Sequence, residues 1–146
     1  MSHISSIEVK ITDLGAFEAA CTECGVELRR NQRTFRNYGG RNSPCEMAVV
    51  LSGNERAYEL GLVRTADGQG YAIQMDNWQR GLGMNDKVGT DACTLRQLYG
   101  VHAATAAARK QGMNVARQQL PDGSIRLVCE PRVAYAQAGA GIGSGF

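Results

Sequence analysis

The sequence lacks several features that would assign it to a large functional class. No apolar run approaches the ~20 residues that cross a bilayer. The first residues also lack the basic and then apolar segments of an export signal. These absences predict a cytoplasmic protein that has no membrane partner.

Catalytic signatures are also missing. There is no P-loop, no dinucleotide-binding fingerprint and no strand-turn-helix motif around a nucleophilic serine. We therefore predict no catalytic residues and no cofactor, and we favour a non-enzymatic role. An enzyme of unknown reaction stays open as an alternative, and it would need a pocket that joins His102 to Asp76 or Asp91.

Cysteine is present in an odd number, five residues, so a disulfide framework is not expected in a chain without an export signal. Cys21 and Cys24 have the spacing of a zinc or redox motif, but no second ligand pair follows. Both cysteines continue the apolar stripe of Leu14 and Phe17. We interpret them as core residues, and we predict no metal site.

Proline, glycine and hydrophobic periodicity divide the chain into elements. Alternation predicts a strand over 3–12, and helical spacing predicts a helix over 14–24 between an Asp13 cap and a Gly25 stop. Further expected elements are extended segments at 26–30 and 34–38, strands at 47–51, 58–63 and 71–75, an ordered loop at 76–89, a helix from Thr90 or Asp91 to Gly112, and strands at 113–119 and 124–130.

Most of these neighbouring strands are joined by turns of hairpin length, and too few helices separate them for a parallel sheet. We predict an α+β fold, a mainly antiparallel sheet with two helices packed on one face. Residues 1–130 are expected to form a single domain. Residues 131–146 form a tail rich in glycine and alanine, which buries little by itself and could hold a partner.

Charge is unevenly distributed, although the net charge is only +2. Five arginines lie between Leu28 and Cys45, where no acidic residue occurs, and two aromatic residues lie among them. Arginine and aromatic side chains suit a phosphate-bearing or acidic partner. The alternative is a strand edge that its charge keeps from aggregating. The predicted binding residues are Arg29, Arg30, Arg33, Arg36, Tyr38 and Arg41.

Three further side chains are candidates for a site. His3 and His102 are the two histidines, and the fold could bring them together as an acid/base or ligand pair. Each could instead be a hydrogen-bonded, partly buried residue. Trp78 is the single tryptophan, and it would either line a pocket or anchor the core.

A series of landmarks carries a resemblance to a known family. The chain is similar to the hypothetical chloroplast reading frame thirty-five family, also called domain of unknown function twelve fifty-seven, over about residues 2–130. The landmarks are Ser2 to Ser5, Asp13-Leu14, Tyr38-Gly39-Gly40, Tyr58 to Gly61, Trp78, Leu95 to Tyr99, Gln111-Gly112 and Asp122-Gly123-Ser124-Ile125-Arg126-Leu127-Val128.

The resemblance implies no activity or catalytic residues. Some bacterial members are encoded near AAA-type ATPases, which implies a protein partner. We therefore expect a non-enzymatic interaction or assembly module that self-associates or acts as an adaptor in a larger complex, built on an AAA-type ATPase or on viral or structural proteins. The alternative is a nucleic-acid-binding protein that uses the Arg29–Arg41 segment.

Overall fold

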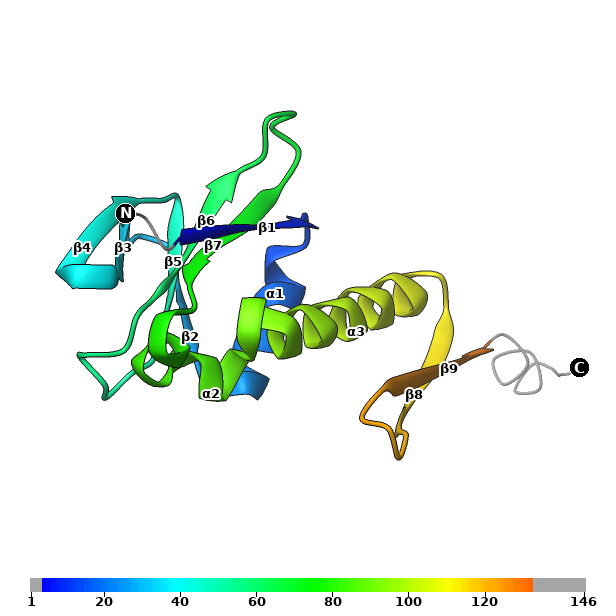
Figure 1. Cartoon of the computed structure of the whole chain (residues 1–146). Helices are drawn as coiled ribbons and strands as arrows, with labels where there is room; N and C mark the ends of the chain where they lie inside the picture. The colour runs from blue at the N-terminus through cyan, green and yellow to red at the C-terminus, as the bar shows by residue number, and fades with distance from the viewer. Residues whose placement is uncertain (1–3, 133–146) are drawn as a thin grey trace, which may run out of the picture. The chain divides into compact units, whose positions relative to one another are not determined.

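The structure, a computed structural model, describes residues 4–132. It divides the chain into two compact units, Met1–Tyr99 and Gly100–Phe146, where the sequence predicts one domain over 1–130. Helix α3 (Cys93–Lys110) contributes to both units (Figure 1). Residues 133–146 of the predicted tail, and with them its expected role in holding a partner, lie outside the described residues.

The first unit is built on a five-stranded antiparallel sheet with the strand order β1-β7-β6-β5-β2. Strands β5, β6 and β7 are consecutive neighbours, as the sequence predicts, whereas β1 adds to the far side of β7. The strands are β1 (Ile4–Ile11), β2 (Glu27–Arg29), β5 (Met47–Val50), β6 (Leu60–Arg64) and β7 (Tyr71–Asp76).

Helix α1 (Leu14–Cys24) begins and ends where its capping residues predict. The Asp13 carboxylate accepts a hydrogen bond from the Ala16 backbone N–H at 3.0 Å, which satisfies one of the free donors of the first turn. Gly25 has a φ of 84°, the left-handed conformation that a C-terminal stop requires. Both caps are therefore confirmed.

One face of the sheet carries α1 and the beginning of α3 (Figure 1). The Tyr99 ring on α3 meets Phe17 on α1 edge to face, with ring centroids 6.0 Å apart. The Tyr99 hydroxyl accepts hydrogen bonds from the backbone N–H groups of Thr12 and Asp13 at 3.0 and 3.2 Å, and so fastens α3 to the start of α1. The predicted α+β class is confirmed.

The other face is partly covered by a hairpin of β3 (Thr34–Asn37) and β4 (Arg41–Pro44). The sequence predicts only turn residues at 39–44, so β4 is an additional strand. Phe35 projects from the hairpin and packs fully buried against Ala48 and Val50. A Cβ atom on Gly61 would lie 2.3 Å from Cδ1 of Phe35, so the ring occupies the space that glycine leaves on β6.

The segment after β7 differs from its prediction as an ordered loop. It contains a 3₁₀ segment, η2 (Trp78–Gly83), the short helix α2 (Met84–Val88) and a turn at Thr90–Ala92. The predicted start of the second long helix at Thr90 or Asp91 is wrong, because Asp91 has a φ of 53° and α3 begins at Cys93. The hydrogen bonds that Asp91 makes to Asn77 hold it in this turn instead.

The second unit contains the rest of α3 and the antiparallel hairpin of β8 (Met113–Gln119) and β9 (Ile125–Pro131). Both strands lie close to their predicted positions. The Asp122 carboxylate accepts from the Ser124 backbone N–H at 2.9 Å and thereby closes the turn. Within residues 4–132, no helix combines the length and hydropathy needed to cross a membrane.

Candidate interaction surface

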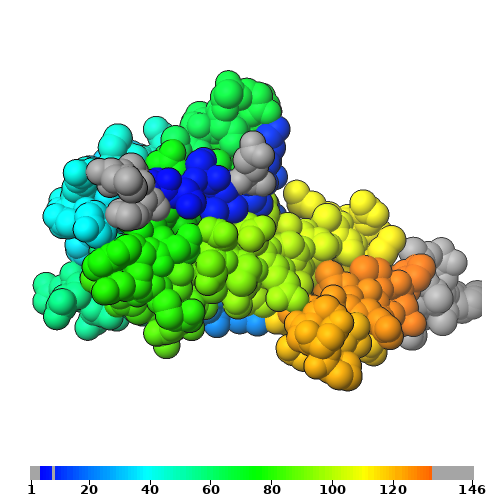
Figure 2. All heavy atoms as spheres, in the orientation of Figure 1, coloured from blue at the N-terminus to red at the C-terminus, as the bar shows by residue number. Residues whose placement is uncertain are grey.

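The arginine segment predicted from the sequence is the β2 strand and the β3–β4 hairpin, which lies at the surface of the first unit in cyan (Figure 2). Gly39 and Gly40 have φ values of 71° and 76° and close the hairpin after Tyr38. The guanidinium groups therefore extend from three strands and from the segment that connects β2 to β3, and they do not form one continuous stripe.

Three of the five arginines lie against carboxylates, two of which are distant in the sequence. Arg29 pairs with Glu27 at 3.4 Å and Arg30 with Glu18 at 3.1 Å. Arg36 pairs with Glu59 at 3.6 Å. The positive charge that seems uncompensated along the chain is therefore largely neutralised in space.

The other two arginines have no carboxylate partner among the described residues. Arg33 donates from Nη1 to the backbone carbonyl of Glu46 at 2.5 Å. Arg41 is exposed at the hairpin end, where it pairs in register with Asn37. These two residues retain the positive charge that could meet an acidic partner.

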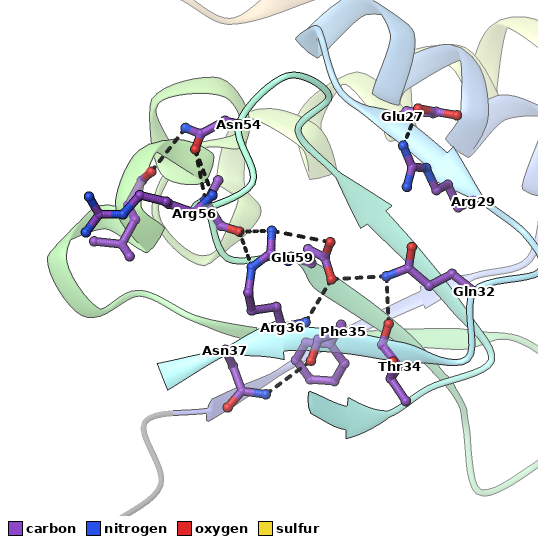
Figure 3. A network of polar contacts seen from close by, with 12 residues as sticks. Glu27, Arg29, Gln32, Thr34, Phe35, Arg36, Asn37, Asn54, Arg56 and Glu59 are labelled. Carbon is purple, nitrogen blue, oxygen red and sulfur yellow. Dashed lines mark hydrogen bonds and ion pairs between the residues drawn. The ribbon is translucent and has the colours of Figure 1, made fainter. Parts of the chain in front are cut away.

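Glu59 is the centre of a polar network that fixes the hairpin to the sheet (Figure 3). Its side chain is buried, and Oε1 accepts from the Arg36 backbone N–H at 2.8 Å and from Gln32 Nε2 at 3.0 Å. The Arg36 guanidinium also donates to the Ala57 carbonyl at 2.8 Å. Two of the three guanidinium nitrogens of Arg36, Nε and Nη2, are thus engaged within the chain.

Tyr38 and Trp78, two candidates that lie 40 positions apart in the sequence, form an aromatic pair. Their ring centroids are 4.9 Å apart and the ring planes make an angle of 85°. Trp78 is 38% exposed, and among the described residues it is the one large hydrophobic side chain that is classed as exposed. Part of the ring is therefore accessible to a partner.

The backbone after Trp78 holds this side chain at the surface through an unusual conformation. The Asp76 carboxylate accepts from the Trp78 backbone N–H at 2.9 Å. Residues 79–82 then have φ values of 46°, 56°, 62° and 52°, four consecutive left-handed residues of which only Gly81 is glycine. Such a conformation costs on the order of 1 kcal/mol per non-glycine residue.

Side chains beneath this turn are polar and buried. The Asn77 side-chain oxygen accepts from Asn85 Nδ2 at 2.9 Å and from the Asp91 backbone N–H at 3.0 Å. Within the described part of the chain, Asp76 Oδ2 and Asn85 Oδ1 have no hydrogen-bond partner, although both residues are at most 2% exposed. Unpaired buried oxygens are unfavourable for folding, and so is left-handed backbone. Both features occur in the segment that contains Trp78.

Tyr58 lies under the same region, because its backbone N–H donates to the Gly81 carbonyl at 2.9 Å. Burial raises the pKa of the Tyr58 hydroxyl, and the nearby Asp76 carboxylate and then Tyr38 raise it further. The hydroxyl therefore stays protonated and can donate a hydrogen bond at any physiological pH.

A match to a known family includes both the β3–β4 hairpin and the Trp78 segment. Residues 20–128 match the family described as Protein of unknown function (DUF1257). The chain belongs to this family. Neither the curated proteins nor the solved structures gave a significant match. Membership in the DUF1257 family supplies no activity, so function has to be argued from the surface itself.

The two histidines predicted as a candidate pair are not brought together within the described residues. His3 lies outside them. His102 is half-buried on α3 in the second unit, where it lines a cavity with Arg109 and Arg117. The residues that line that cavity do not include Asp76 or Asp91, which belong to the first unit.

The cysteines of this DUF1257 member are free thiols with different environments. Cys21 is fully buried on α1, as its apolar stripe predicts, and burial raises the pKa of its thiol to about 12. Burial also raises the pKa of Cys45, to about 11. Among residues 4–132, no group of three or more potential ligands could hold a metal ion.

These environments predict which thiols react. At pH 8 we expect a disulfide reagent to modify the exposed Cys93 and Cys129 rapidly and the other three thiols slowly, because thiolate is the reactive form and the raised pKa values suppress it. Absorbance of the released reagent should show two fast equivalents, and five in denaturant. A third fast equivalent in the folded protein would contradict the shielded placement of Cys21, Cys24 or Cys45.

Sequence reasoning missed the residues that support the Trp78 side chain. Gly81, Gly83 and Gly89 do indicate an irregular backbone after β7, and that signal was available. Left-handed Gln79, Arg80 and Leu82 could not be predicted, because side-chain-bearing residues rarely adopt this conformation. In the sequence, Asp76 is a polar residue at the end of a predicted strand, and only the structure shows that it is buried.

Proposed function

We propose that this protein is a non-enzymatic interaction module that binds a protein partner through Tyr38, Trp78 and Arg41. One observation carries the proposal, namely that the single tryptophan is 38% exposed on a backbone whose strain and buried polar groups fix its position. Tryptophan, tyrosine and arginine are the residues most enriched among those that dominate binding energy at protein interfaces. A side chain fixed before binding loses little entropy when the partner arrives.

The charge of the surface defines the chemistry of the partner. Arg41 directly follows the Tyr38–Gly40 turn and has no acidic partner among the described residues, so it favours a carboxylate on the partner. Trp78 requires an apolar pocket. We therefore infer a partner surface with an apolar depression whose rim is acidic.

Nucleic acid binding is the second candidate, and the partly exposed Tyr38–Trp78 ring pair favours it, since bases stack on such rings and Arg41 closely follows Tyr38 in the chain. It ranks below a protein partner because Arg29, Arg30 and Arg36 already pair with carboxylates. Fewer free cations release fewer counterions from a phosphate backbone, so the electrostatic contribution is small.

Three narrower statements are also part of the proposal. The landmarks Tyr38-Gly39-Gly40 and Asp122 to Val128 support a relationship to the hypothetical chloroplast reading frame thirty-five proteins. That relationship supports an adaptor role beside an AAA-type ATPase or a second copy of the chain. The five free cysteines support a cytoplasmic location, where thiols stay reduced.

Replacing Trp78 with alanine is expected to abolish partner capture while leaving the fold intact. Loss of an interface anchor of this kind costs about 2 kcal/mol or more, about 30-fold in Kd. The measurement compares tagged full-length wild type and Trp78→Ala in extracts of the source organism, with bound proteins quantified by mass spectrometry. Circular dichroism confirms that the variant is folded.

Tyr71→Ala provides the matched control, because Tyr71 is another partly exposed aromatic residue of the first unit and packs under Arg64. A protein that Tyr71→Ala retains and Trp78→Ala loses is a specific partner of this surface. Equal capture by both variants would contradict the proposal. Retention that instead disappears after nuclease treatment would favour the nucleic-acid alternative.

A further inference from the structure

The second unit contains a surface cavity of about 170 Å³ between α3 and β8. His102, Thr105 and Arg109 lie at positions i, i+3 and i+7 of α3 and therefore share one side of the helix. Val115 and Arg117 are two positions apart on β8 and share one face of the hairpin. All five residues line the cavity, together with Val101.

The polar side chains that line this cavity can all donate hydrogen bonds, and two of them are cationic. Two guanidinium groups, an imidazole and a hydroxyl line it, and none of its lining residues between 100 and 132 is acidic. His102 and Thr105 are half-buried, whereas Arg109 and Arg117 are exposed at its rim. Cations and hydrogen-bond donors that converge without an acid are the arrangement that recognises an oxyanion.

The register of the hairpin keeps the nearby acids away. Val115 pairs with Cys129 and Asn114 with Glu130, so Glu130 projects from the face opposite Val115 and Arg117. Asp122 is engaged in its own turn, where Oδ1 accepts from Ser124. Residues 100–132 contain five basic and two acidic side chains, so this unit carries the positive excess that the sequence suggests for the Arg29–Arg41 segment.

A third arginine supports the end of the helix. Arg132 donates from Nη2 to the Arg109 backbone carbonyl at 3.1 Å, and its backbone N–H donates to the Gly112 carbonyl at 3.0 Å. These bonds tie the last described residue of the hairpin to the C-terminal end of α3. They fix the two walls of the cavity against each other and add positive charge near the Arg109 side of it.

The size of the cavity restricts the ligand. A water molecule takes about 30 Å³ in the liquid, so 170 Å³ accommodates roughly five or six atoms of that size. A phosphate group has five heavy atoms and three or four acceptor oxygens, which match the separate donors on α3 and β8. Val101 and Val115 supply an apolar wall that strengthens charge interactions by excluding water.

We propose that this cavity binds the phosphate group of a small molecule, either inorganic phosphate or a phosphomonoester, through Arg109, Arg117, Thr105 and His102. The site is separate from the Tyr38–Trp78 surface and does not depend on it. Arg109 and Arg117 supply the charge at the rim. Thr105 and His102 complete the set of donors at the floor.

The test titrates full-length protein in low salt with inorganic phosphate and, separately, with glycerol phosphate. Binding is followed by calorimetry and by backbone amide shifts in NMR. We expect saturable binding with shifts concentrated in residues 100–132. Arg109→Gln with Arg117→Gln should weaken it about tenfold or more, since each removes a charged hydrogen bond. Tighter binding of glycerol phosphate identifies a phosphomonoester as the ligand, and equal or tighter binding of inorganic phosphate identifies the free ion.

Arg126→Gln is the matched control, because Arg126 pairs with Gln118 and projects from the opposite face of the same hairpin. An equal loss in this control would show diffuse attraction to a basic surface and overturn the site. Tighter binding of a single-stranded oligonucleotide than of glycerol phosphate, with steep salt dependence, would also overturn it in favour of nucleic acid. Trp78→Ala should bind phosphate like the wild type, so failure of either proposal is recognised separately.

Discussion

Replacing Phe35 with alanine should destabilise the first unit by about 3–5 kcal/mol, the largest effect that we expect from a single substitution. The ring is fully buried against Ala48 and Val50 and fills the space above Gly61. Its removal leaves a cavity between the β3–β4 hairpin and the sheet, and the rigid strands can close it only in part. The midpoint of urea unfolding should fall accordingly.

Fluorescence of Trp78 is the appropriate probe, because it is the single tryptophan and lies in the first unit. A chain with two compact units need not unfold in one step, so a probe confined to one unit keeps the free energy of unfolding well defined. Phe35→Leu should cost clearly less than Phe35→Ala, since most of the volume is kept. Similar midpoints for Phe35→Ala and the wild type would show that the hairpin does not depend on this contact.

Much of the fold is predictable from local patterns in this chain. The cap at Asp13 and the turn at Asp122-Gly123 each specify their own element, since the interactions are between residues close in sequence. The alternation of Ile7, Val9 and Ile11 predicts strand β1 from its pattern alone, although its partner strand β7 is distant in the sequence. The uninterrupted apolar run Met47–Val50 is explained by the structure, where Phe35 covers Ala48 and Val50 and the register directs Met47 and Val49 to the opposite face.

The surface is less predictable, because it depends on contacts between distant residues. Arg30 and Glu18, or Arg36 and Glu59, are separated by 12 and 23 positions, so the sequence shows an arginine cluster whose neutralisation becomes visible only in three dimensions. Likewise, Tyr38 and Trp78 are recognisable as candidates one by one, but their pairing requires the hairpin and the strained turn together. The sequence predicts binding residues over Arg29–Arg41, whereas the contacts in the structure lead us to propose Tyr38, Trp78 and Arg41.

Replacing Glu59 with alanine should destabilise the first unit by about 2–3 kcal/mol, the second large effect that we expect. Glu59 is 8% exposed, and its Oε1 is the acceptor for the Arg36 backbone N–H and for Gln32 Nε2. Without it, the Arg36 N–H loses its partner where water reaches it poorly, and Gln32 Nε2 keeps only the Thr34 carbonyl. Arg36 retains the Ala57 carbonyl, which limits the loss. Urea unfolding followed by Trp78 fluorescence measures the change.

Two further variants, Glu59→Gln and Glu55→Ala, separate the loss of the hydrogen-bond acceptor from the loss of a negative charge. Glutamine keeps a carbonyl oxygen that can accept from the Arg36 N–H, so it should lose only the charge contribution and cost less than alanine. Glu55 is exposed in the same connection, and its replacement should change stability by no more than about 0.5 kcal/mol. If Glu59→Ala were as stable as Glu55→Ala, the network would not hold the hairpin. If it is destabilised as expected, the same variant should weaken partner capture by Tyr38, because the hairpin that carries this ring is fixed to the sheet through Glu59.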